Sequence, residues 1–342
     1  MKLFKIKYIV FLALLFATRV LLAQTNEIST PPLNLTENTP KQPNKEDNLH
    51  YNKAILAAEN KDYVTSLKEF AEALKLNPKN IFALYGRATV YYELGMKNEA
   101  LADLTNLLKI DNKDEKALYL RAVINDQLAR YEDAIKDYQA LLKLNPNSDI
   151  YNLNIAYCYQ VAGQKQQAID KYLKAETLGN TSNELVYNLI GLYYEMKQYS
   201  NALKYIDKAY SKKLENDYVV SIQLEILLDQ GDCEKSVEIV DKYSTLISKD
   251  LPAIYQNIAD CFYQKENYEE ASNYFLKSYS LKPELVESLF NSAVAKLKNK
   301  KIDSAISDFE LFLEKTENRT DLDKLRTDAR NQIDFFKKKN QK

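Results

Sequence analysis

The pentapeptide Leu-Lys-Leu-Asn-Pro occurs twice in this chain of 342 residues, at Leu74–Pro78 and at Leu142–Pro146. The starting numbers of the two copies differ by 68, which is twice 34. A third proline, Pro283, follows Pro146 at a distance of four such periods plus one inserted position. Proline lacks an amide hydrogen and its ring clashes with the preceding turn, so regularly spaced prolines predict regularly spaced helix ends. We therefore expect helical units that repeat with this period.

Other residue types keep the same period. With the proline at position 32, eight repeats start at residues 47, 81, 115, 149, 183, 217, 252 and 286. Position 8 is alanine in six repeats, and position 20 is alanine or serine in all eight. Position 24 is bulky, as at Phe70 and Tyr138, and lies on the same helical face as position 20. Gly95, Gly163 and Gly231 share position 15, where a glycine can end a helix in the left-handed conformation.

In these columns the chain resembles the tetratricopeptide repeat family, whose 34-residue units follow a Leu-Gly, Tyr, Ala, Phe, Pro pattern. The resemblance covers residues 47–319. It implies an all-α, right-handed superhelical solenoid of about eight helix-turn-helix units. The chain departs from the pattern in having no tryptophan, and repeat six lacks the proline and has Leu224 at position 8. One inserted residue precedes Pro252, so we expect the packing to change over residues 217–252, between repeats one to five and repeats seven and eight.

Residues 1–23 are expected to be a secretory signal peptide. Lys2, Lys5 and Lys7 precede an apolar run, and Ala23 offers a small residue at the cleavage position. Arg19 interrupts the apolar stretch, so no uncharged run of about 18 residues is available for a membrane-spanning helix. The expected location is the periplasm or the secreted space, with no transmembrane span in the mature chain. An uncleaved N-terminal membrane anchor is the alternative.

The segments that flank the repeats differ in composition. Residues 24–46 are rich in proline and asparagine and are expected to form a disordered linker. Residues 320–342 combine apolar residues at helical spacing with a basic tail, which suits a helix that caps the last repeat. The apolar residues are Leu322, Leu325, Ala329, Ile333 and Phe336.

Charge and motifs argue against several functions. The chain has 47 basic and 48 acidic residues, and loss of residues 1–23 would leave 43 against 48. A mildly acidic chain without a clustered basic face is not expected to bind nucleic acid. His50 is the only histidine, and no glycine-rich phosphate loop or catalytic motif is present. We therefore expect no enzyme activity, no cofactor and no metal site, and we expect acids such as Asp103 on solvated helix faces.

Three cysteines, Cys158, Cys233 and Cys261, lack metal-ligand spacing. Cys158 and Cys261 share position 10, in repeats four and seven, and helix layers about 10 Å thick keep them too far apart to bond. Cys233 lies in the turn of repeat six and could meet a partner from another chain. Buried, inert thiols are the preferred interpretation.

The family resemblance also implies a binding surface. In the family, positions 2, 5, 9 and 12 of the first helices line a concave wall, and in this chain those positions are rich in tyrosine. Tyrosine supplies contact area and a hydroxyl with few rotatable bonds, although the same rings could simply pack on neighbouring helices. Acids outnumber bases at these positions, which favours a basic or amphipathic peptide as partner. The predicted partner-binding residues are Tyr85, Tyr92, Tyr119, Asp126, Asn154, Tyr157, Tyr187, Asn188, Tyr194, Glu225, Asn257 and Tyr263.

The three asparagines in this set share position 6, where a side-chain amide could pair with the backbone of an extended peptide or serve the fold. Lysine at position 5, which some family members use to grip a C-terminal carboxylate, is absent from every repeat. The sequence therefore predicts a non-catalytic interaction scaffold of the cell envelope or secreted space that binds a peptide segment of a protein partner. The alternative is a glycan or cell-wall polymer stacked on the tyrosines.

Overall fold

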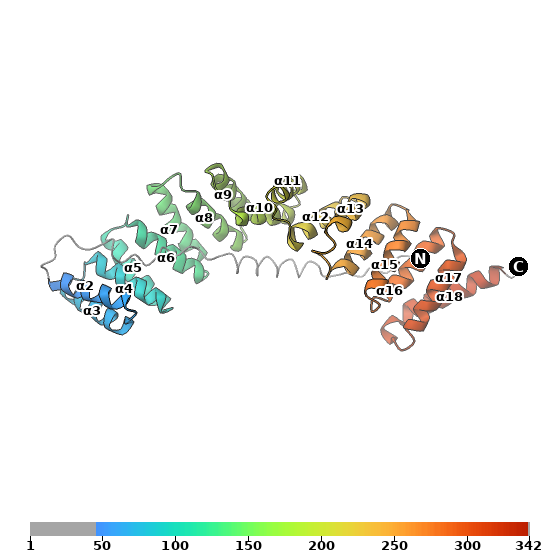
Figure 1. Ribbon diagram of the computed structural model, residues 1–342, viewed down its shortest axis with the longest axis horizontal. Helices are drawn as coiled ribbons and strands as arrows, with labels where there is room; N and C mark the ends of the chain where they lie inside the picture. Colours follow the sequence, from blue (N-terminus) through green and yellow to red (C-terminus); the bar gives the residue numbers. More distant parts are fainter. Residues whose placement is uncertain (1–45, 341–342) are drawn as a thin grey trace. The chain divides into compact units, whose positions relative to one another are not determined.

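The computed structural model describes residues 46–340, which form seventeen α-helices, one short 3-10 helix and, within that range, no strand (Figure 1). The expected signal peptide and all but the last residue of the expected linker lie outside the described residues. Helices follow one another in pairs, and most helices pack on their neighbours in the chain. The predicted all-α solenoid is confirmed.

Eight helix pairs make up the repeats, with even-numbered first helices and odd-numbered second helices. The first helices are α2 (Glu46–Glu59), α4 (Ile81–Glu93), α6 (Glu115–Gln127), α8 (Asp149–Val161), α10 (Asn183–Glu195), α12 (Asp217–Asp229), α14 (Leu251–Gln264) and α16 (Glu287–Lys298). The second helices are α3 (Tyr63–Leu76), α5 (Lys97–Ile110), α7 (Tyr131–Leu144), α9 (Lys165–Thr177), α11 (Tyr199–Ser211), α13 (Cys233–Tyr243), α15 (Tyr268–Leu281) and α17 (Ile302–Lys315). The 3-10 helix η2 (Thr320–Leu322) and α18 (Asp323–Asn340) follow the last pair.

The turn inside every pair uses a residue with positive φ at position 15. Three of these residues are the expected glycines, Gly95, Gly163 and Gly231. The other five repeats place a residue with a side chain there, with φ between 56° and 61°. These five are Lys61, Ala129, Lys197, Glu266 and Lys300. Because this conformation costs a residue with a Cβ atom roughly 1 kcal/mol, the packing of the two helices, rather than glycine, imposes the turn.

The repeated prolines mark helix ends as expected. Pro78, Pro146 and Pro283 each lie two residues beyond the end of a second helix. After Pro78 and Pro146 the next first helix begins with a side-chain cap; the Asn80 side chain, for example, accepts a hydrogen bond from the backbone N–H of Ala83 at 3.0 Å. Pro252 differs, because it lies in the first turn of α14, where a missing N–H costs no hydrogen bond.

The small and bulky columns form the buried interior. Ala88 and Ala100, at positions 8 and 20 of repeat two, have no exposed surface, and neither does Phe70 at position 24 of repeat one. A Cβ atom at Gly86 would lie 2.5 Å from Cζ of Phe70, so the glycine gives this ring its space. Small residues therefore let helices approach closely, and the bulky residue fills the remaining volume.

The C-terminal helix α18 covers the last repeat. Leu325, Ala329 and Ile333 are buried in one cluster with Phe309 and Phe312 of α17. The expected capping helix therefore buries the apolar face that the sequence predicts. The opposite side of α18 is polar, apart from the exposed Phe335.

Repeat six closes irregularly. Its second helix, α13, has 11 residues, whereas the other second helices have 13 or 14. Residues 244–250 form a run of turns that accommodates the inserted residue. Ile247 in this run is 1% exposed and packs in the same cluster as Ile258 of α14. The irregular segment is thus still anchored to the interior.

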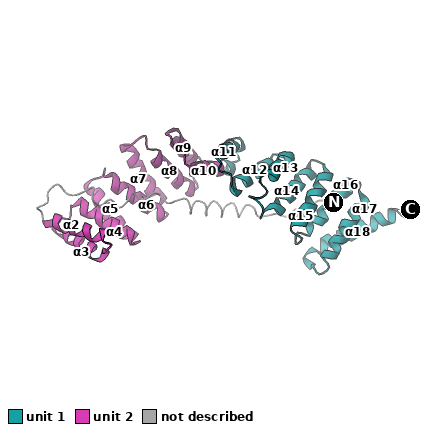
Figure 2. Cartoon of the chain, in the orientation of Figure 1, with its two compact units in different colours: residues 1–21, 193–342 teal, residues 22–192 magenta. Residues whose placement is uncertain are grey.

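The chain divides into two compact units, which among the described residues are 46–192 and 193–340 (Figure 2). The division falls within α10, in repeat five, and not in the irregular repeat six. The anchoring of residues 244–250 on α14 gives a physical reason for this, because it joins repeat six to repeat seven. The expected change of packing angle over residues 217–252 stays a prediction.

The positive-φ turns predict that an alanine-to-glycine substitution has opposite effects on stability in a turn and inside a helix. Ala129→Gly should raise the free energy of unfolding by about 1 kcal/mol, because glycine adopts positive φ without a Cβ clash. Ala102→Gly, at an exposed position inside α5, should lower it by about 1 kcal/mol. Urea unfolding followed by circular dichroism measures both. A loss of stability in Ala129→Gly comparable to that in Ala102→Gly would contradict the proposed strain.

Candidate functional site

We define the first-helix face as positions 2, 5, 9 and 12 of the first helices, together with the asparagines at position 6. Eleven of the twelve predicted binding residues are half-buried on it, and Asn188 alone is buried. The half-buried residues are Tyr85, Tyr92, Tyr119, Asp126, Asn154, Tyr157, Tyr187, Tyr194, Glu225, Asn257 and Tyr263. Each of these side chains therefore packs on the solenoid and still presents part of its surface to solvent.

The tyrosines of residues 46–192 pack on neighbouring helices through part of each side chain. The Tyr119 ring centroid lies 6.2 Å from those of both Tyr138 and Tyr151. The Tyr92 hydroxyl accepts a hydrogen bond from Nε2 of Gln127 at 2.8 Å. Burial raises the pKa of Tyr85 to about 12. These tyrosines therefore pack on neighbouring helices and also keep part of their surface exposed to solvent.

A hydrogen-bonded chain joins repeats four and five. The Tyr172 hydroxyl donates to Oε1 of Gln160 at 2.8 Å and accepts from Nδ2 of Asn188 at 2.9 Å. Asn188 is 5% exposed, so in repeat five the asparagine at position 6 serves the fold. Asn154 occupies the same position one repeat earlier and is half-buried.

The acidic residues of this unit are partly desolvated. Asp126 accepts a hydrogen bond from the Cys158 thiol, with Sγ and Oδ1 3.7 Å apart. Burial raises the pKa of Asp126 to about 6. Burial also raises the pKa of Glu184, at position 2 of repeat five. Removing carboxylates from water in this way strengthens their attraction for a cation that approaches them.

In residues 193–340 two tyrosines and two acids form a second polar cluster. The hydroxyl of Tyr194 donates to Oε2 of Glu225, and the hydroxyl of Tyr199 donates to Oδ2 of Asp229 at 2.6 Å. The two tyrosine rings stack with centroids 6.2 Å apart and an interplanar angle of 22°. The hydrogen bond to Asp229 raises the pKa of Tyr199 to about 12, and burial followed by the charge of Asp229 raises the pKa of Glu225.

Sequence reasoning selected Tyr194 and Glu225 but missed Tyr199 and Asp229. Asp229 lies one helical turn after Glu225 on α12, so the two acids share one helical face. This four-residue spacing in the sequence could have indicated that Asp229 belongs to the cluster. Tyr199 belongs to the second helix, outside the positions that the family resemblance implies. Further along the chain, Tyr263 contacts the Tyr268 ring edge-on at 5.2 Å.

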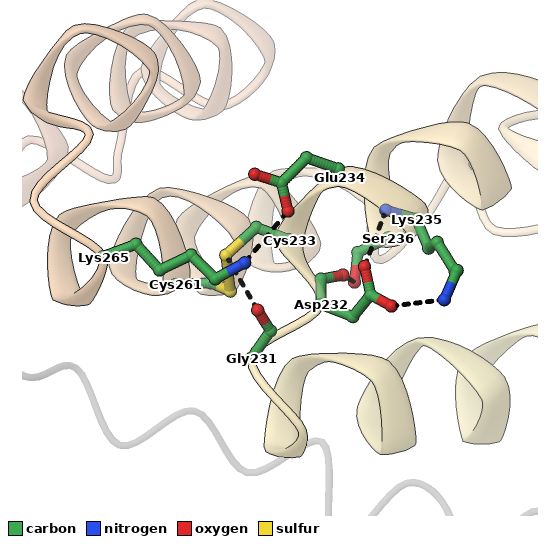
Figure 3. A network of polar contacts seen from close by, with 8 residues as sticks. All are labelled: Gly231, Asp232, Cys233, Glu234, Lys235, Ser236, Cys261 and Lys265. Atoms are coloured by element: carbon green, nitrogen blue, oxygen red, sulfur yellow. Dashed lines mark hydrogen bonds and ion pairs between the residues drawn. A yellow bond between two sulfur atoms is a disulfide. The ribbon is translucent and has the colours of Figure 1, made fainter.

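The expectation of three buried thiols is wrong for two of them. Cys233, at the start of α13, and Cys261, in α14, form a disulfide with an S–S distance of 2.01 Å and Cα atoms 5.8 Å apart (Figure 3). The second helix of one repeat packs on the first helix of the next repeat. This packing brings Cys233, at position 17 of repeat six, against Cys261, at position 10 of repeat seven. Cys158 is a free, buried thiol, as expected. Lys265 and Glu234 form an ion pair across the same junction at 3.0 Å.

The expectation of solvated acids is wrong at position 23 of several repeats, among them repeats two and three. Asp103 accepts two hydrogen bonds from Arg87, both at 2.7 Å, and Asp137 accepts two from Arg121, at 2.8 and 2.6 Å. The aspartate side chains are only 5% and 6% exposed. Positions 7 and 23 face each other inside a helix pair, so the recurrence of Arg and Asp at these positions in successive repeats was the missed signal.

The lone histidine has a structural partner. Nδ1 of His50 lies 2.6 Å from Oε2 of Glu69, which occupies position 23 of repeat one. Within residues 46–340, no group of three or more histidine, cysteine, aspartate or glutamate side chains is arranged to hold a metal ion. None of the helices in the described part of the chain is long and apolar enough to cross a membrane.

Helix pairs that recur with a constant period define the class of α-helical repeat solenoids, and comparison with known proteins identifies the family. Models of the tetratricopeptide repeat match residues 82–111, 115–148 and 252–285. A TPR repeat-containing protein of Methanocaldococcus jannaschii, MJ1428, is 28% identical over 123 residues, which are 36% of this chain and 21% of that protein. The chain is therefore a tetratricopeptide repeat protein.

Two solved structures resemble this chain at low sequence identity. The chain in a structure of Naa15/Naa10 bound to HypK-THB matches 81% of this chain and 43% of its own length, with a TM-score of 0.58 and 18% identity. A tetratricopeptide repeat protein from Parabacteroides merdae matches 74% of this chain and 97% of its own length, with a TM-score of 0.46 and 18% identity. These likenesses concern the fold alone.

The disulfide predicts a measurable loss of stability on its removal. Cys233→Ser/Cys261→Ser should lower the free energy of unfolding of the surrounding repeats by about 3 kcal/mol, because the bond closes a loop with a sequence separation of 28. Urea unfolding measures this, with Cys158→Ala as the control that leaves the bond intact. Alkylation of the denatured, unreduced chain should label one cysteine, and labelling of three would contradict the bond.

The raised pKa of Asp126 predicts a pH-dependent effect. A carboxyl group with a higher pKa in the folded chain destabilises the fold above both pKa values, and the penalty disappears as the pH falls below the unfolded value near 4. Asp126→Asn should therefore raise the unfolding free energy by about 1–2 kcal/mol at pH 7.5 and change it little at pH 4. Asp170→Asn, at an exposed site, is the control. Equal effects of Asp126→Asn at both pH values would contradict the assignment.

Proposed function

We propose that the chain is a non-catalytic scaffold that binds a peptide segment of a partner protein along the first-helix face. Tetratricopeptide repeat proteins typically bind protein partners, which supports this class of function. The observation that carries the proposal is the row of half-buried tyrosines at equivalent positions of successive first helices.

Half-burial suits these tyrosines to binding. Tyr119 is fixed by the rings of Tyr138 and Tyr151, and Tyr92 by its hydrogen bond with Gln127. A side chain already held in place loses little conformational freedom when a partner contacts it, so less of the binding free energy is spent on ordering. Buried aromatic area with a hydroxyl at its end is also the chemistry that dominates many protein interfaces.

The acids on this face favour a basic or amphipathic segment. Asp126 and Glu184 in residues 46–192, and Glu225 in residues 193–340, are half-buried carboxyl groups whose pKa is raised by burial. Lysine or arginine side chains of a partner would supply the positive charge that attracts these carboxylates. We infer that the partner segment carries basic residues among apolar ones.

We further infer that the scaffold works in the cell envelope or the secreted space. Two observations support this location: the signal-like residues 1–23 and the disulfide between Cys233 and Cys261. Cytosolic reductants keep most thiols reduced, whereas exported proteins form and retain disulfides. The two observations are independent, because one concerns the leader and the other the packing of repeats six and seven.

The test uses two tyrosines of neighbouring repeats. A photo-cross-linking residue placed at Tyr119 in the native host should capture the partner for identification by mass spectrometry. Binding of the purified partner should then weaken at least tenfold in Tyr119→Ala/Tyr157→Ala, since each buried aromatic contact is worth on the order of 1 kcal/mol or more. The measurement is fluorescence anisotropy with the full mature chain.

Two tyrosines on second helices provide the matched control. Tyr63→Ala/Tyr131→Ala removes the same atoms from equally half-buried positions outside the first-helix face and should leave affinity within threefold. An equal loss in this control would contradict binding along the face. Loss of retention on a polysaccharide affinity gel, with protein binding intact, would instead favour the glycan alternative.

A further inference from the structure

We propose that Tyr194, Tyr199, Glu225 and Asp229 form a recognition site for an arginine or lysine side chain of the partner. The site rests on the proposed function and specifies the chemistry of the partner at one place. All four residues belong to the unit 193–340, and they come from the end of α10, the start of α11 and the second half of α12. Figure 1 labels these three consecutive helices. We name this group the tyrosine–acid site.

The hydrogen bonds of the site hold the aromatic and acidic groups together. Each tyrosine hydroxyl donates to a carboxylate of the next first helix, Tyr194 to Glu225 and Tyr199 to Asp229. Both carboxylates lie on one face of α12, one helical turn apart, while the two rings stack 6.2 Å apart. The four side chains therefore form one group in which two stacked rings are hydrogen-bonded through their hydroxyls to two carboxyl groups.

No basic residue in the described part of the chain neutralises this group. Elsewhere in the same unit, acids pair with lysines: Glu234 with Lys265 at 3.0 Å and Glu310 with Lys337 at 2.8 Å. Among the described residues, neither Glu225 nor Asp229 makes such a pair. The groups that shift the pKa of Glu225, besides its burial, are Tyr194 and Asp229, and neither is a cation.

A basic side chain of a partner matches what the site presents. The second oxygen of each carboxylate can accept a hydrogen bond from a guanidinium or ammonium group, because each tyrosine hydroxyl donates to one oxygen only. The flat guanidinium of arginine can also stack on a tyrosine ring and bind a carboxylate through two N–H groups. Tyr199 is half-buried and Asp229 is exposed, so the site is open to such a side chain.

The test begins with the full mature chain and a cellulose-bound array of random dodecapeptides with graded arginine and lysine content. We expect the bound peptides to be enriched in these two residues. A soluble, fluorescein-labelled copy of a bound peptide should lose at least tenfold in affinity when its arginine is replaced by citrulline, which has a similar shape without the charge. Fluorescence anisotropy at low salt measures the dissociation constants.

The variant Glu225→Gln/Asp229→Asn connects this preference to the site. It should bind the arginine peptide at least tenfold more weakly than the natural chain. Replacing the peptide's arginine by citrulline should not weaken its binding to this variant any further. The amide oxygens still accept the tyrosine hydrogen bonds, so the fold is retained and can be checked by the thermal unfolding midpoint. Glu238→Gln/Asp241→Asn removes two charges from exposed positions of α13 in the same repeat and should change affinity less than threefold.

The outcomes separate this inference from the proposed function. Peptides bound without preference for basic residues, or a citrulline effect that persists in Glu225→Gln/Asp229→Asn, would overturn the tyrosine–acid site and leave peptide binding in place. An equal loss in Glu238→Gln/Asp241→Asn would also overturn it, since net charge would then account for the effect. Binding of no peptide at all would overturn both proposals.

Discussion

The close approach of neighbouring helices is the constraint on which the rest of the structure depends. Alanines at positions 8 and 20, such as Ala88 and Ala100, are fully buried, and a bulky residue at position 24, such as Phe70, fills the space that they leave. Close-packed interiors tolerate few voids, so this combination fixes the distance between helices. The turn must then reverse the chain within a few residues, and even Ala129 adopts a positive φ to satisfy it.

Hydrogen bonds connect residues of the first-helix face to the closely packed helices. The chain from Gln160 through Tyr172 to Asn188 and the pair of Tyr194 with Glu225 both join adjacent repeats. Buried polar networks that are satisfied in this way are rigid. Within each compact unit, nearest-neighbour contacts thus hold these tyrosines and acids at repeated positions.

Repeat six accommodates one inserted residue and still packs on repeat seven. The inserted residue ends α13 early, yet Ile247 remains buried and the bond between Cys233 and Cys261 joins the same two repeats. The packing lost from a short helix is replaced by a covalent link and an apolar anchor. The division between the compact units falls within α10 instead.

The sequence by itself determined the helices, their period, their turns and the buried columns, because these depend on residues close together in the chain. Tertiary structure alone decided which side chains meet across helices. It paired Cys233 with Cys261, placed Arg87 on Asp103, buried Asn188 and brought Tyr199 to Asp229. Such partners stand at different repeat positions, so a column of equivalent residues does not by itself show which two positions meet. Whether two positions face each other depends on how one helix packs on the next, and that geometry exists only in the folded chain.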